Sequence, residues 1–122
     1  MSSHRLRYAV LAGVLGVTAG CAGDGPDRAV GLESRDYTFS GLDGFVGRAG
    51  EKVEFVMTNR GPADHEFEVF DPDGHELGEI EPVSTGATGK ATFSLKKPGT
   101  YRFVCGVSDH EDRGMHGTFE VR

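Results

Sequence analysis

The stretch Pro98-Gly-Thr-Tyr-Arg-Phe-Val-Cys105 joins a turn, a strand pattern and a cysteine. Proline presets φ and glycine tolerates positive φ, so Pro98-Gly99 indicates a turn. Tyr101 and Phe103 then recur with a period of two, which predicts a strand that faces both side chains inwards. Cys105 would stand at the end of that strand, where the chain leaves the sheet.

The same period of two recurs through most of the chain. Apolar side chains alternate with other residues at Tyr37 and Phe39, at Val53, Phe55 and Met57, at Phe67 and Val69, at Ala91, Phe93 and Leu95, and at Phe119 and Val121. A weaker strand is expected around 76–81, after the turn Asp71-Pro72-Asp73-Gly74. No helical stripe of useful length occurs. Short alternating strands between Gly- and Pro-containing turns predict an all-β, antiparallel β-sandwich.

Three side chains with metal-binding chemistry follow the quoted strand within eleven residues. Cys105, His110 and Met115 form a Cys-x4-His-x4-Met pattern, and His65 lies upstream. A thiolate and two imidazoles, with a weak axial thioether, are the ligands of blue-copper electron-transfer sites. Soft sulfur favours Cu(I) and imidazole also suits Cu(II), so the set predicts one copper ion that can cycle between both states.

Other interpretations of these residues exist. Taken singly, a cysteine or methionine is more often a buried hydrophobe, and a scattered histidine is more often a surface residue. Zinc in a Cys/His2 site is chemically possible, although methionine is a poor zinc ligand. The spacing, more than any single residue, indicates copper.

The N-terminus has the pattern of an export signal. Arg5 and Arg7 precede an uncharged apolar run over 8–19, which is shorter than the about 20 residues of a membrane span. The run ends in Thr18-Ala-Gly-Cys21, which resembles the lipobox of bacterial lipoproteins, except that leucine is usual at the first position. That resemblance implies cleavage before Cys21, lipidation of its thiol, and anchoring at the extracytoplasmic face of the cell membrane. Ordinary signal cleavage, giving a soluble exported protein, is the alternative.

The chain has two cysteines, and export bears on both. In an oxidising compartment the default is to pair them. Acylation of Cys21 would leave Cys105 as a single exported thiol, which is an oxidation liability that metal ligation would justify. A Cys21–Cys105 disulfide is the alternative, and it would tie a flexible leader to a strand end.

The predicted cleavage site sets the length of the exported part. Cleavage before Cys21 would leave 102 of the 122 residues, about the size of one β-sandwich domain. We therefore assign 1–20 to a lipoprotein-type signal peptide, 21–34 to a flexible tether and 35–122 to the domain. The tether is assigned because its Gly, Asp and Pro content comes with few apolar residues.

Charge narrows the choice of partners. Removing Arg5 and Arg7 from the 13 Lys and Arg leaves 11 against 19 Asp and Glu, a net charge near −8. That balance argues against nucleic acid, which needs a basic surface. It allows steering towards a basic patch on a partner protein. The alternative is that the acidic residues only keep an exported domain soluble.

Four stretches together resemble the cupredoxin family of small copper proteins. They are Phe45-Val-Gly-Arg-Ala-Gly-Glu-Lys-Val53, Asn59-Arg-Gly-Pro-Ala-Asp-His-Glu-Phe67, Pro98 to Cys105, and His110 to Val121 with Gly-Met-His-Gly at 114–117. The resemblance implies a Greek-key β-sandwich with copper at one end. It also implies the ligands His65, Cys105, His110 and Met115, with the His110 edge as electron port. The Cys-x4-His-x4-Met spacing is similar to that of auracyanins and rusticyanin, and less so to plastocyanin.

Three residues near the predicted site need an interpretation. Glu66 stands where the family often has Asn or Ser, and we expect it to point outwards as a solvated strand residue. Pointing inwards, it would favour Cu(II) and lower the reduction potential. His116 offers a second imidazole beside Met115, but adjacent loop residues point apart, so we expect His116 at the surface. His75, in a turn, is also expected to be exposed.

The leading functional hypothesis is a membrane-anchored one-electron carrier with a redox partner protein. It is not predicted to be an enzyme, because the sequence shows no acid–base pair or substrate pocket. A copper chaperone, scavenger or sensor with the same ligands is the second hypothesis. The third, a metal-free adhesive sandwich, would leave Cys105, His110 and Met115 clustered without a purpose.

Overall fold

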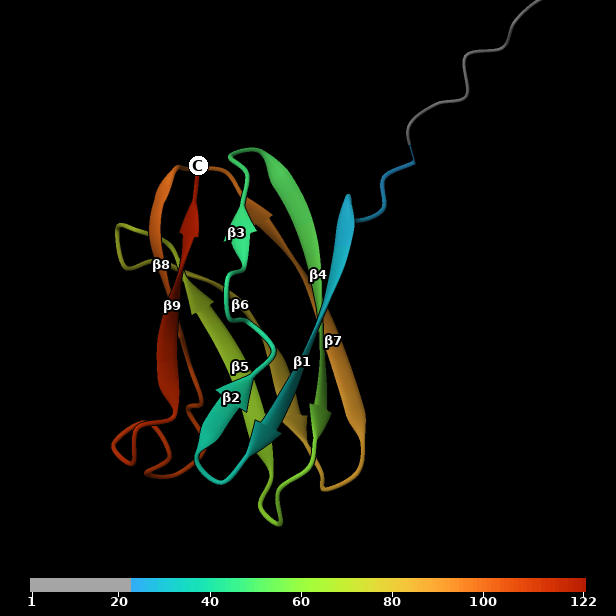
Figure 1. Ribbon diagram of the computed structural model, residues 1–122, viewed down its shortest axis with the longest axis vertical. Coiled ribbons are helices and arrows are strands. Elements are labelled where there is room, and N and C mark those ends of the chain that lie inside the picture. The colour runs from blue at the N-terminus through green and yellow to red at the C-terminus, as the bar shows by residue number, and fades with distance from the viewer. Residues whose placement is uncertain (1–22) are drawn as a thin grey trace, which may run out of the picture.

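The computed structural model describes residues 23–122, and these form two β-sheets packed face to face (Figure 1). The predicted signal peptide, 1–20, and the predicted lipidation site, Cys21, lie outside the described residues. One sheet has the order β2-β1-β4-β7 and the other has the order β3-β9-β8-β5-β6. No helix long and apolar enough to cross a membrane occurs between residues 23 and 122. The all-β prediction is confirmed.

The strands have the following bounds: β1 Arg28–Arg35, β2 Thr38–Ser40, β3 Val46–Gly47, β4 Glu51–Asn59, β5 His65–Phe70, β6 Glu76–Val83, β7 Thr88–Leu95, β8 Gly99–Val104 and β9 His116–Val121. β5 and β6 form an antiparallel hairpin, β7 belongs to the other sheet, and β8 returns to pair with β5. This return beside an earlier strand is a Greek-key type of connection.

Both sheets are mixed, which corrects the prediction of a purely antiparallel sandwich. β1 pairs with β4 in parallel, and β3 pairs with β9 in parallel. A parallel pair needs a crossover longer than a hairpin turn. The chain between β1 and β4 supplies one, because it includes β2 and β3 before returning to β1.

The predicted tether, 21–34, is wrong over 28–34, where the chain forms β1. β1 pairs with β4 from Arg28↔Val53 to Ser34↔Asn59. Leu32 is 3% exposed and Ser34 is fully buried, so one face of β1 lies on the core. The signal for this strand is short, because only Val30 and Leu32 mark its inward face with large apolar side chains, between Arg28 and Ser34.

The core lies between the sheets and is rich in aromatic rings. Phe55 of β4 and Phe67 of β5 come from opposite sheets, and their ring centroids are 5.3 Å apart. Buried Phe93 packs on both of them. The Tyr101 hydroxyl donates to the Lys97 carbonyl at 2.8 Å, which satisfies a polar atom at the core edge. Predicted inward positions are therefore confirmed on β4, β5, β7, β8 and β9.

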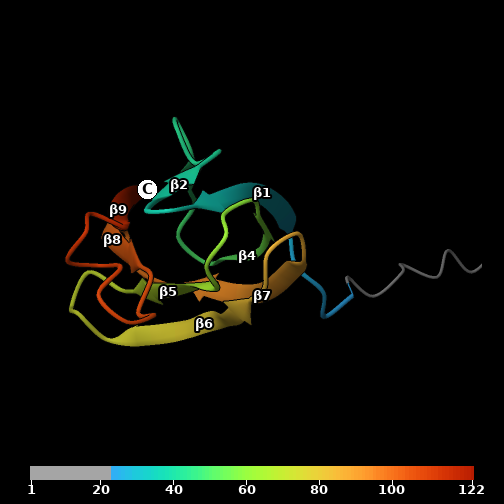
Figure 2. The same ribbon diagram turned by 90° about the horizontal axis from the view of Figure 1, so that it is seen from below.

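Three of the connections at one end of the sandwich form the predicted site. These are the turn from β1 to β2, the connection from β4 to β5, and the loop from β8 to β9, and all lie, with the connection from β6 to β7, at the lower end of Figure 1. Figure 2 views the molecule from that end, with the β8–β9 loop beside β5. Because the strands hold the bases of all three connections, side chains far apart in sequence meet there.

Candidate metal centre

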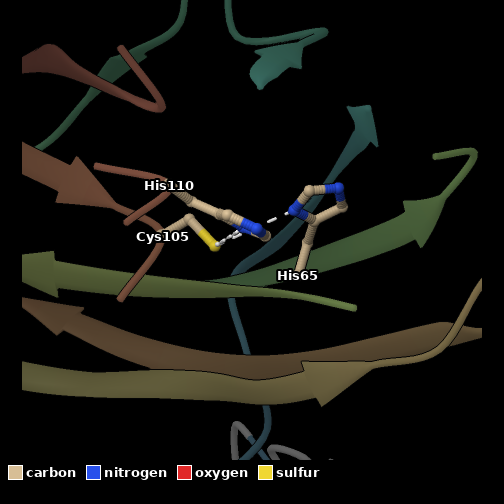
Figure 3. A group of neighbouring side chains, drawn as sticks. All are labelled: His65, Cys105 and His110. Atoms are coloured by element: carbon tan, nitrogen blue, oxygen red, sulfur yellow. Dashed lines mark hydrogen bonds between the residues drawn. The ribbon is translucent and has the colours of Figure 1, made fainter. Parts of the chain in front are cut away.

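His65, Cys105 and His110 converge at this end of the sandwich (Figure 3). Cys105 Sγ lies 3.9 Å from His65 Nδ1 and 3.5 Å from His110 Nδ1. The two imidazole centroids are 4.9 Å apart. His65 and Cys105 are fully buried and His110 is 6% exposed. Three of the four predicted ligands thus point at one another in a site closed to bulk water.

These separations fit a metal ion bound in a trigonal plane. Bonds of about 2.3 Å to sulfur and about 2.0 Å to nitrogen, as in zinc sites, separate the two donors by about 3.7 Å at 120°. The two observed sulfur–nitrogen distances lie on either side of that value. These two distances therefore fit one first-row ion held between the sulfur and the two nitrogens.

Met115, the fourth predicted ligand, is fully buried, and its backbone bonds to two of the other three. Its N–H donates to the His110 carbonyl at 3.0 Å, and its carbonyl accepts from the Cys105 N–H at 3.0 Å. Gly114 has a φ of +98°, a conformation that glycine adopts without strain. The turn at Gly114 places Met115 inside and leaves His116 exposed. The prediction that His116 lies at the surface is confirmed.

His65 is oriented by a carboxylate that the sequence did not reveal. His65 Nε2 donates to Asp36 Oδ1 at 2.7 Å, which leaves Nδ1 facing Cys105. Gly61 allows this approach, because a Cβ there would lie 2.8 Å from Asp36 Oδ1 and 3.0 Å from His65 Nε2. Carboxylates of this kind fix the tautomer and ring orientation of metal-binding histidines. Asp36 carries no local pattern that separates it from other strand-end acids.

The connection before His65 is held by a buried amide. Asn59 is fully buried, and its Nδ2 donates to the carbonyls of Ala63 and Val83 at 2.7 Å each. Its Oδ1 accepts from the Gly61 N–H at 2.9 Å. Asn59 thereby fixes the loop between β4 and β5 and sets where His65 begins β5.

His110 is covered from the outside by an aromatic ring. The Tyr37 ring lies edge-on to the imidazole, with centroids 5.0 Å apart. The Arg113 guanidinium stands 4.9 Å from the Tyr37 centroid, and Arg113 pairs with Asp109 at 2.9 Å. Tyr37 was expected to alternate into the core, but it lies between β1 and β2 and contacts the centre instead.

The thiol of Cys105 is not ionised by its protein surroundings. Burial raises its pKa, and the nearby carboxylates of Glu66 and Glu68 raise it further. Backbone N–H groups of Glu66 and Val107 act against these effects by donating to the sulfur. A thiolate at this position therefore depends on a bound cation, as is general for metal sites that displace protons.

Glu66 was expected to be a solvated strand residue, and this prediction is wrong, because the residue is only 9% exposed. It does alternate away from the ligands, and its carboxylate faces those of Glu68 and Glu79. The register shifts between His65 and Phe67, and the backbone at Gly106 packs over this face. The outward side chain is thus covered. His75 is exposed, as predicted.

A β-sandwich with two histidines, a cysteine and a methionine at one end has the ligand set of a type 1 copper site. The family model for the cupredoxin-like domain matches residues 10–121. The chain belongs to the cupredoxin-like family.

Two relatives of known description match part of the chain. The copper-resistant cuproprotein CopI of Rubrivivax gelatinosus is 30% identical over 91 residues, which cover 62% of this chain and 54% of that protein. A blue copper protein of Pisum sativum is 34% identical over 68 residues, covering 55% of this chain and 36% of that protein. The chain thus spans about half and about a third of these two relatives.

Solved structures of similar fold include several auracyanins. Auracyanin B matches with a TM-score of 0.70 and 18% identity, over 82% of this chain and 92% of that one. Reduced auracyanin of Roseiflexus castenholzii matches with a TM-score of 0.68 and 18% identity, over 80% of this chain and 99% of that one. Auracyanin A of Chloroflexus aurantiacus matches with a TM-score of 0.66 and 16% identity, over 77% of this chain and 98% of that one. At these identities the likeness concerns the fold.

Proposed function

We propose that this chain is an exported one-electron carrier that binds a single copper ion through His65, Cys105, His110 and Met115. The observation that carries the proposal is the convergence of two Nδ1 atoms and one sulfur at a buried point. A bound copper ion supplies a Cu(I)/Cu(II) couple, for which this mixed sulfur and nitrogen set is suited.

The protein's part in this function is to fix the positions of the ligands and to exclude water from them. Asp36 fixes the His65 ring, and backbone hydrogen bonds from Met115 tie the ligand loop to Cys105 and His110. Burial of these side chains keeps water from the donors. Ligands that do not move between oxidation states lower the reorganisation that electron transfer requires.

A redox partner protein is part of the proposal. Of the buried histidines, His110 lies closer to the surface, since it is 6% exposed and His65 is fully buried. Half-buried Tyr37 covers it. A partner would therefore approach at the face formed by His110 and Tyr37. The role requires no bound substrate, so we propose no enzymatic activity.

Export and anchoring rest on the N-terminal sequence. We propose that 1–20 is a signal peptide and that Cys21 carries the lipid that holds the domain at the extracytoplasmic face. The stretch available as a tether is short, because β1 begins at Arg28. As a coil of about six residues it would reach about 13 Å, which keeps the domain close to the membrane surface.

Copper handling is the second candidate, and one observation favours it. The relative from Rubrivivax gelatinosus is described as a copper-resistant cuproprotein. A chaperone, scavenger or sensor could use the same ligands. The difference lies in what happens to the ion, because a handler exchanges copper with other molecules and a carrier retains it through many redox cycles.

The visible spectrum after Cu(II) addition tests the site. A thiolate ligand gives an intense band, so wild type should become blue or green, and Cys105→Ala should stay colourless while keeping its far-ultraviolet circular dichroism. A coloured Cys105→Ala protein would refute the assignment. Repeated reduction and oxidation with a Cu(I) chelator present then separates the two functions: an electron carrier keeps its band, and a copper handler loses it.

A further inference from the structure

A turn of the four-stranded sheet contacts both histidine ligands of the five-stranded sheet. Residues 36–37 join β1 to β2, whereas His65 begins β5 and His110 lies in the loop between β8 and β9. Asp36 Oδ1 accepts from His65 Nε2 at 2.7 Å, and the Tyr37 ring lies edge-on to the His110 imidazole with centroids 5.0 Å apart. The turn therefore closes over the metal centre from the opposite sheet, with Tyr37 on the side of His110.

Arg113 holds the Tyr37 ring in this position. The Arg113 guanidinium stands 4.9 Å from the Tyr37 centroid, which is a cation–π contact. Its Nε donates to Asp109 Oδ2 at 2.9 Å, and the Arg113 N–H donates to the carbonyls of Asp109 and His110 at 3.1 Å each. Arg113 is thus anchored on the ligand loop itself, and through Tyr37 it fastens the β1–β2 turn to that loop.

Tyr37 lies where the centre is nearest to solvent. His110 is 6% exposed, whereas the other three ligands are fully buried. The side chains of Arg113 and Asp109 are 51% and 54% exposed, so their contacts can break without disturbing the core. Local openings of this kind need less free energy than unfolding of the sheets. The route between water and the metal position that requires the least opening therefore passes His110 and the Tyr37 ring.

We propose that Tyr37, held by Arg113 and Asp109, is a cover over His110 that sets the rate at which copper enters and leaves the centre. Tyr37 does not bind the ion: it is a positioning residue that holds the His110 ring and blocks the approach of water and chelators. Opening of the cover speeds binding and release together, so the affinity changes less than either rate. Both contacts of Tyr37 are made by its ring, so phenylalanine should replace it.

The cover deepens the proposed function, and it rests on that function only in taking copper as the ion. A closed cover slows the exchange of copper with the surroundings. Slow exchange suits an electron carrier, which retains its ion through many redox cycles, better than a copper handler, which passes the ion on.

Reaction of the buried thiol tests the cover without copper. In the copper-free Cys21→Ser chain, Cys105 is the single thiol and is fully buried, so its reaction with DTNB at one pH reports how often the centre opens. Tyr37→Ala should react about tenfold faster, since it loses an aromatic pair and a cation–π contact. Arg113→Met should react about threefold faster, since it loses the cation alone. Tyr37→Phe keeps the ring and should react at nearly the rate of the parent chain.

Arg28→Met is the matched control. Arg28 stands 4.9 Å from the Phe45 centroid and pairs with Glu51 at 2.9 Å, so it makes the same two kinds of contact as Arg113. It does so at the start of β1, away from the metal centre, and its thiol should react at the rate of the parent chain. Circular dichroism should show that all variants are folded.

Copper release is the second readout. With excess chelator, the visible band should disappear about tenfold faster in Tyr37→Ala than in wild type. The copper affinity from equilibrium competition should change by a smaller factor than the release rate. A contact that only stabilises the bound state would raise the release rate and lower the affinity by the same factor.

Two results would overturn the cover. One is a Tyr37→Ala chain whose thiol reacts as slowly as that of the parent chain. The other is an equal acceleration in Arg28→Met and Arg113→Met, which would mean a general loosening of the sandwich. A faster thiol reaction in Tyr37→Ala, with no copper band in wild type, would sink the proposed function alone. A copper band in wild type, with an unchanged thiol reaction in Tyr37→Ala, would sink the cover alone.

Discussion

Removal of the hydrogen bond between Asp36 and His65 should weaken copper binding measurably. The bond is 2.7 Å long, and it joins a fully buried ring to a carboxylate whose side chain is 24% exposed. Loss of such an orienting carboxylate lowers metal affinity about 10–100-fold, or about 1.4–2.8 kcal/mol. Asp36→Ala should fall in this range because His65 is then free to rotate. Asp36→Asn should lose less, because an amide oxygen still accepts from Nε2.

The assay is competition for copper against a chelator of known affinity, followed by the visible band. Asp43→Ala is the control, since it removes an exposed carboxylate at the surface and should leave affinity unchanged. Asp36→Asn should also raise the reduction potential, because a negative charge near the site is lost. An affinity of Asp36→Ala within about twofold of wild type would refute the orienting role of Asp36.

Three further predictions concern the axial ligand, the anchor and pH. Met115→Gln should lower the reduction potential, since oxygen favours Cu(II), and Met115→Leu should raise it. The measurement is voltammetry, with His116→Ala as the control whose potential should change little. A large change in the potential of His116→Ala would reassign the axial ligand. Cys21→Ser should move the protein from the membrane to the soluble fraction, and a wild-type protein that is already soluble would exclude lipidation. The pKa of Glu68 is raised by burial and by Glu66 from 4.5 to about 7, so the folded state holds this proton more tightly than the unfolded state. In urea titrations the free energy of unfolding should therefore fall as pH rises through that window, and Glu68→Gln should remove the fall.

The parts of the fold that sequence predicts are those where large apolar side chains mark one face. Phe55 and Phe67 alternate with polar neighbours, and both are fully buried. β1 is harder to predict because only Val30 and Leu32 mark its inward face, within a stretch that also carries Gly, Asp and Pro. Ser34 is fully buried on that face, although a serine gives no hydrophobic signal of burial.

Some residues of the site can likewise be predicted from the sequence, and others cannot. Cys105, His110 and Met115 are close in sequence, so their chemistry can be predicted from spacing. Asp36 and Tyr37 reach the centre only through the turn between β1 and β2, a contact that depends on how the sheets pack. Their contribution to the centre is a property of the tertiary structure and leaves no mark in local sequence.

The spread of the ligands over the chain couples the metal to folding. His65 and Cys105 are 40 residues apart, and they come from different connections at the same end of the sandwich. The unfolded chain would have to close that loop before both could bind one ion, which costs entropy. A metal that binds the folded state far better than the unfolded state stabilises the fold. Because burial raises the pKa of the Cys105 thiol, that stabilisation also includes the release of a proton. The sandwich thus preorganises the centre, and the bound ion should in turn hold together the three connections that form it.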